Sequence, residues 1–188
     1  MRTITKALVS MAAFFAPVAL PQAATLGGFD YAIQYDYREF YSIADNKPFQ
    51  VIIVGNPFPG QPIAEVSRRM LPMMQAGKPP PNLTFTYDAP SQEPRPYYRV
   101  VLVFNATNEF GADSVCRGKV NTTEGAPGRI KLFAVYCRND QFMSQVLASA
   151  TAERPDEPEI RALYTQLFAE LFPRGQGRYP QPGSTQFR

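Results

Sequence analysis

Side chains that commonly carry out chemistry are few in this chain and widely spaced. No histidine occurs among the 188 residues, which excludes Ser-His and Cys-His nucleophilic pairs, His-ligated zinc and histidine acid–base catalysis. Two cysteines cannot form a four-thiolate metal site, and no Ser-x-x-Lys or dinucleotide-binding sequence is present. We therefore predict that the protein is not an enzyme and has no cofactor. An enzyme that uses two carboxylates, or a serine and a lysine, brought together by folding stays open as an alternative.

The first 24 residues follow the plan of a cleavable secretory signal peptide. Arg2 and Lys6 form a positive segment, residues 7–20 are almost wholly apolar, and Ala23 and Ala24 offer a cleavage point. The apolar run is shorter than a typical membrane span. The alternatives are an uncleaved anchor and a buried N-terminal helix. We predict cleavage after Ala23 or Ala24, a periplasmic or secreted location, and no stable membrane span after cleavage.

Export would leave a nearly neutral protein. Cleavage removes Arg2 and Lys6 from the 19 basic residues and none of the 16 acidic residues, so the net charge falls from +3 to +1. Such a balance carries no electrostatic footprint for nucleic acid, and it gives no support for charge-driven membrane binding.

Cys116 and Cys137 are predicted to form one structural disulfide. An even, minimal number of cysteines in an exported protein favours a bridge, here closing a loop of about twenty residues. Two buried free thiols are the first alternative. A redox-active pair is the second, but the spacing is not that of a Cys-x-x-Cys motif.

Runs of β-branched and aromatic residues predict the strands that position these side chains. Residues 98–105 are apolar through their centre, as in a strand buried on both faces. Residues 49–54 and 129–137 are similar, and residues 83–87 alternate between apolar and polar. Residues 115–120 suggest a short edge strand that pairs near the two cysteines.

Weaker patterns predict two hairpins and one further strand. Alternating tyrosines hint at a strand in residues 31–37, and the turn residues 45–48 suggest a hairpin into the strand at 49–54. Residues 83–105 suggest a hairpin with a long loop.

Three segments are predicted to be helical. Residues 63–76 and 160–171 carry apolar side chains at helical spacing, although Pro72 should kink or end the first of them. Residues 141–150 follow Asn139 and Asp140, which are common helix caps.

These elements predict an α+β fold with a mostly antiparallel twisted sheet and helices packed mainly on one face. One parallel strand pair within residues 49–87 is expected, joined by the helix between them. We expect a single domain over residues 25–173 and a disordered tail over residues 174–188, which is rich in Gly, Pro, Gln and Ser.

Four side chains are candidates for interaction. Phe58 lies between two prolines in the loop 55–60, where it is either a hydrophobic contact point or, the favoured interpretation, packed on the core beneath a surface turn. Arg138 lies beside the predicted disulfide. It is either part of a ligand site or, the favoured interpretation, a solvated residue before a helix cap. Arg99 and Tyr136 are the other two candidates.

Five segments carry a resemblance when they are taken together, namely residues 55–60, 82–87, 99–104, 116–118 and 132–140. They resemble an uncharacterised family of small exported bacterial proteins of unknown function. The resemblance covers most of residues 38–173 and implies no activity, cofactor or site.

Two function classes follow. The first is a non-enzymatic envelope or periplasmic module that binds a protein or surface partner through Phe58, the methionine-bearing helix, the tyrosine-rich N-terminal segment or the tail. The second is a small-ligand-binding protein whose pocket lies between sheet and helices, where Arg99, Tyr136 and Arg138 converge. The sequence identifies neither the partner nor the oligomeric state.

Overall fold

The computed structural model describes residues 24–92, 94–107 and 111–175. The expected signal peptide, apart from Ala24, and the tail from residue 176 onward lie outside these residues. The elements, in chain order, are β1 (Thr25–Tyr31), α1 (Tyr37–Ala44), β2 (Pro48–Val54), α2 (Ile63–Gly77), β3 (Thr84–Thr86), β4 (Tyr98–Phe104), α3 (Ala112–Cys116), β5 (Arg129–Arg138), β6 (Gln141–Thr151) and α4 (Pro158–Leu171).

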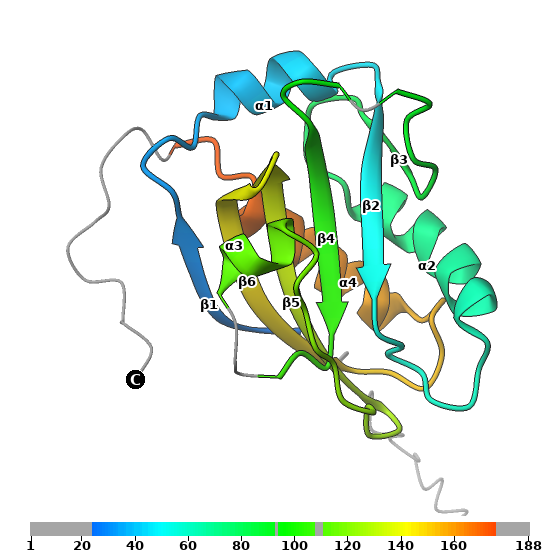
Figure 1. The fold of residues 1–188 in the computed structure, drawn as a ribbon. Coiled ribbons are helices and arrows are strands. Elements are labelled where there is room, and N and C mark those ends of the chain that lie inside the picture. The colour runs from blue at the N-terminus through cyan, green and yellow to red at the C-terminus, as the bar shows by residue number, and fades with distance from the viewer. Residues whose placement is uncertain (1–23, 93, 108–110, 176–188) are drawn as a thin grey trace, which may run out of the picture.

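One six-stranded sheet organises the fold, with the strand order β1-β6-β5-β4-β2-β3 (Figure 1). The pairs β1–β6, β6–β5 and β5–β4 are antiparallel, whereas β2 runs parallel to both β4 and β3. The α+β class is confirmed, but the prediction of a mostly antiparallel sheet is wrong, because the sheet is mixed. The sheet is mixed because β2 is inserted, in parallel orientation, between β3 and β4, which both follow it in the chain.

The strand–helix–strand unit is confirmed, and the hairpin over residues 83–105 is wrong. β2, α2 and β3 form the expected parallel pair. β3 and β4 lie on opposite sides of β2, so they cannot pair with each other.

Helices cover the two faces of the sheet unequally. α2 and α4 pack on each other behind the sheet of Figure 1, and α4 also contacts β1, β5 and β6. Beneath them lies the main core, which includes Phe49, Val100, Leu102, Leu167 and Phe168. α3 lies on the opposite face over a smaller second core.

β4 separates these two cores. Val100 and Leu102 point into the main core, and Val101 and Val103 point into the second core, which also contains both cysteines. Burial on both faces therefore explains the apolar run of β4 at residues 100–104. Each fully buried Leu or Val there stabilises the fold by about 2 kcal/mol.

The predicted helix at residues 141–150 is wrong, because this segment is the strand β6. Asn139, whose φ is +52°, and Asp140 form a tight turn, so Arg138 pairs directly with Gln141. β6 then pairs with β5 on one side and with β1 on the other. Pairing along both edges overrides the weak local preference for a helix.

Three smaller predictions are also corrected. Residues 115–120 do not form an edge strand, because α3 occupies Ala112–Cys116. β1 ends at Tyr31, before most of the segment expected to be extended, and α1 replaces the hairpin into β2. Asp36 begins α1 by accepting a hydrogen bond from the Arg38 N–H at 2.8 Å.

The two amphipathic helices are confirmed. α2 spans Ile63–Gly77 with Pro72 inside it, and α4 spans Pro158–Leu171 with six of its side chains buried. No helix in the described part of the chain is both long and apolar enough to cross a membrane.

Candidate functional site

One stretch of open sheet edge, on β2, lies beside a groove. β3 has only three residues and pairs with residues 48–50 of β2. Residues 51–54 of β2 pair with β4 on one side, and on the other side no strand of the described chain pairs with them. Backbone groups of this half of β2 that point away from β4 therefore face no strand of the described residues.

The alternation of the strand shows which groups are unpaired. The Lys47 carbonyl accepts a hydrogen bond from the Thr84 N–H at 3.0 Å, so it faces β3. Backbone groups of alternate residues in a strand point to the same side, so those of Ile53 point to the open edge. Those of Ile52 point to β4.

Side chains close the edge next to β3 but not the edge of β2. Gln75 reaches from α2 to the outer edge of β3, where it accepts a hydrogen bond from the Phe85 N–H at 2.8 Å and donates one to the Leu83 carbonyl at 2.9 Å. The chain then leaves the sheet at Tyr87, whose hydroxyl donates to the Ser67 carbonyl at 2.9 Å. Burial raises the pKa of the Tyr87 hydroxyl well above its ordinary value.

A groove of about 640 Å³ runs along the open edge, between β2 and the first half of α2. Its walls are mostly apolar, and Ile63 is 43% exposed there. Arg68 is the charged side chain in the lining, and no described residue forms an ion pair or hydrogen bond with its side chain. The lining includes Ile52, Ile53, Ile63, Arg68, Leu71 and Tyr87.

Phe58 does not contribute to an exposed surface. Its side chain is 4% exposed and belongs to the main core. The loop is held by the Asn56 side chain, whose Oδ1 accepts from the Phe58 N–H at 3.0 Å and whose Nδ2 donates to the Gln61 carbonyl at 2.8 Å. The favoured interpretation, a surface turn with Phe58 beneath it, describes the structure.

Tyr136 lies in an aromatic cluster rather than in a cavity. It is 2% exposed, and burial is the main reason that the pKa of its hydroxyl lies well above the ordinary value. The rings around it are those of Tyr35, Phe40, Phe49, Tyr98 and Phe172. Its surroundings are those of a packed core residue.

Arg138 anchors α1 to the sheet. Its Nη1 lies 3.2 Å from both carboxylate oxygens of Glu39, and the Tyr98 hydroxyl donates to the same carboxylate at 2.5 Å. These groups satisfy one another at a half-buried position, which supports a structural role.

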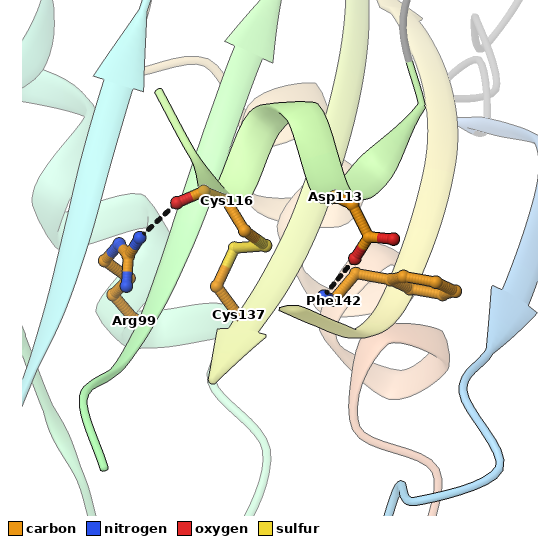
Figure 2. The surroundings of a disulfide bond; sticks show 5 residues. All are labelled: Arg99, Asp113, Cys116, Cys137 and Phe142. Carbon is orange, nitrogen blue, oxygen red and sulfur yellow. Dashed lines mark hydrogen bonds between the residues drawn. A yellow bond between two sulfur atoms is a disulfide. The ribbon is translucent and has the colours of Figure 1, made fainter. Parts of the chain in front are cut away.

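Arg99 lies on the opposite face of the sheet from Tyr136. In the β4–β5 ladder Arg99 is opposite Cys137, and Val100 is opposite Tyr136. Figure 2 shows the Arg99 guanidinium beside the Cys116 carbonyl, to which it donates at 2.5 Å. The structure therefore does not bring Arg99 together with Tyr136 and Arg138, and the pocket predicted from their convergence is not formed.

The disulfide is present and attaches α3 to the sheet. It joins Cys116, the last residue of α3, to Cys137 of β5, with a Cα–Cα distance of 5.6 Å. Figure 2 shows a second link, in which the Asp113 carboxylate accepts from the Phe142 N–H at 3.0 Å. No group of three or more potential metal ligands occurs within the described residues.

Comparisons with known proteins return weak likenesses alone. No protein-family model and no curated sequence matches the chain. Solved structures that match include a single-substitution variant of PelC from Paraburkholderia phytofirmans, a dodecamer, at 12% identity and a TM-score of 0.42. That match covers 79% of this chain and 97% of the other. A second PelC dodecamer from the same organism matches at 12% identity and a TM-score of 0.35, over 80% of this chain and 96% of the other.

The groove was not predicted from the sequence. Arg68 lies off the apolar stripe of its helix, a position typical of a solvated side chain. One signal was available: residues 51–54 are consecutive apolar residues with neither a charge nor a proline, the residues that usually protect an exposed edge.

Proposed function

We propose that the protein is an exported, non-enzymatic interaction module that binds an extended segment of a partner protein along the open edge of β2. The observation that carries this proposal is the outer edge of β2 at residues 51–54, which pairs with no strand of the described residues and lies beside an apolar groove. Strand addition of this kind uses backbone hydrogen bonds for affinity and side-chain pockets for specificity.

The edge determines the length of the partner segment. Four residues of a parallel strand span roughly 13 Å, so the paired part of the segment is about four residues long. Tyr87 closes the end of the groove next to β3, because the chain leaves the sheet there. The partner strand therefore continues the position that β3 vacates.

The groove determines the chemistry of the partner segment. Apolar side chains, at every second position, would contact Ile63 and Leu71 on α2. Arg68 has no partner in the described chain and no acid lies in the lining, so an acidic side chain or a terminal carboxylate fits beside it. We propose a β-branched segment that carries one such carboxylate.

Selection of a displayed random peptide library on the full chain tests this proposal. We expect enriched peptides to combine alternating β-branched residues with an acid. Ile53→Pro removes an N–H that points to the open edge and leaves the groups that face β4 in place. It should weaken binding about tenfold, the equivalent of one backbone hydrogen bond.

Two further variants make the test specific. Ile53→Val keeps the N–H and should bind the peptides as the natural chain does. Arg68→Gln should weaken the acid-bearing peptides several-fold and leave peptides whose acid is replaced by its amide unchanged. Equal binding by Ile53→Pro and Ile53→Val, both folded by circular dichroism, would reject strand addition.

The location of the module is tested separately. We propose that a signal peptide directs it to the periplasm or beyond. The protein purified from a cell envelope should begin at Ala24 or Thr25 by intact mass, and a full-length mass would overturn the proposal.

A further inference from the structure

A second pocket, of about 300 Å³, lies at the other side of the sheet, where β4 begins and β5 turns into β6. Its lining is mostly polar and is made by Pro94, Arg95, Tyr97, Arg99, Asn139 and Asp140. Neither the strand-addition groove nor the aromatic cluster shares a residue with it.

Arg99 is the unusual member of this lining. Its side chain is nine-tenths buried, and no described carboxylate forms an ion pair with it. Nη2 donates to the Cys116 carbonyl, whereas Nη1 is shielded from solvent and has no hydrogen-bond partner among the described residues. Removing a charge from water without a counter-charge is unfavourable, so this guanidinium favours a negative group in the adjoining space.

A ring contact and two hydrogen bonds hold the groups around Arg99. The guanidinium lies 4.5 Å from the centre of the Tyr97 ring. The Asn139 N–H donates to the Tyr97 carbonyl at 2.7 Å, and the Asn139 Oδ1 accepts from the Tyr97 N–H at 2.8 Å. This reciprocal pair fixes the β5–β6 turn against the start of β4, and it leaves the Asn139 Nδ2 as a donor at the pocket.

We propose that this pocket binds a small oxyanion, such as inorganic phosphate or a carboxylate group. Arg95 supplies a second guanidinium, which also forms no ion pair with a described acid. Guanidinium groups bind carboxylate and phosphate oxygens with paired hydrogen bonds. The charge of the anion compensates that of Arg99, and Asp140 opposes it from the same lining, which limits the affinity.

Calorimetric titration of the full chain with inorganic phosphate, at constant ionic strength, tests the proposal. We expect saturable binding that Arg95→Gln weakens about tenfold, because one charge-assisted contact is lost. Arg95 is exposed, so this variant does not depend on the buried position of Arg99. Asp140→Asn should tighten binding, because it removes the opposing charge.

Arg129→Gln is the matched control. Arg129 is exposed at the far end of β5, and its loss changes the net charge of the protein by the same amount. The proposal would be overturned if neither phosphate nor acetate binds, if Arg129→Gln weakens binding as much as Arg95→Gln does, or if Asp140→Asn weakens binding. A parallel titration with acetate shows whether phosphate or a carboxylate is the better ligand, and both outcomes fall within the proposed class.

Discussion

Reduction of the Cys116–Cys137 bridge should lower the free energy of unfolding by about 3 kcal/mol. The bridge joins residues 21 apart in the sequence. In the chain-entropy model, a closed loop of this size restricts the unfolded chain enough to give that value. Typical domains are stable by about 5–15 kcal/mol, so the reduced protein should remain folded at room temperature.

The structure says where the reduced protein should loosen. α3 has five residues, too few to be stable without tertiary contacts. With the bridge open, α3 is held by the apolar contacts of the second core, by Asp113 and by Arg99. Amide hydrogens near its end, such as that of Arg117, which donates to the Asp113 carbonyl, should exchange faster with solvent.

Urea unfolding with and without reductant measures the effect. The Cys116→Ala/Cys137→Ala double variant is the control, because reductant should not change its stability. A loss below about 1 kcal/mol in the natural chain would refute the reasoning, since loop closure predicts about three times as much. So would an equal effect of reductant on the double variant.

Three further predictions concern the stability of the fold. Gly55→Ala should lower the free energy of unfolding by about 2–4 kcal/mol in urea, because φ is +80° and the new Cβ would lie 2.5 Å from a carbonyl oxygen of β4. Gly60→Ala is the control, because Gly60 also has a positive φ but lies in open space, and it should lower stability less. Gln75→Ala should lower the stability by about 1–2 kcal/mol and speed amide exchange in β3, and unchanged exchange would contradict its role at that edge. The free energy of unfolding should fall above about pH 10, because tyrosines deprotonate there in the unfolded chain, while burial holds the pKa of Tyr136 higher in the folded state. Urea unfolding followed by circular dichroism at pH 8–12 measures this, and a free energy that does not decline would contradict it.

Elements with strong local patterns were predictable from the sequence. The apolar runs of β2 and β4 and the apolar stripes of α2 and α4 each require a partner surface of one kind. Pro72 did not end α2, although proline removes a backbone hydrogen bond, because the helix is held on both sides of it by packing. The disulfide followed from the number of cysteines.

Elements whose form depends on distant pairing were not predictable. Residues 141–151 have mixed polarity, and the Asn139–Asp140 pair suits a helix cap and a tight turn equally. Pairing with β1 and β5 makes this segment a strand. β1 lies more than a hundred residues earlier in the chain, whereas β5 is separated from β6 by two residues. The open edge is of the same kind, because it exists only where β3 stops short of the length of β2.

The candidate residues separate in the same way. Phe58 and Tyr136 are large side chains whose environment is the core, and Arg138 is satisfied by Glu39. Arg99 was a candidate for a pocket shared with Tyr136 and Arg138, which is not formed. The structure supplies a different reason to keep it, namely burial without an acidic partner among the described residues. Arg68 is a candidate because α2 lies beside the edge of β2, an arrangement that the sequence did not predict.

Amide hydrogen exchange at Ile53, followed by NMR with and without a saturating enriched peptide, tests the central claim most directly. In the free protein the Ile53 N–H should exchange rapidly, whereas the Ile52 N–H, which faces β4, should be protected. Bound peptide should protect Ile53 and leave Ile52 unchanged. Protection of Ile53 already in the free protein, or its continued rapid exchange with peptide bound, would contradict strand addition at β2.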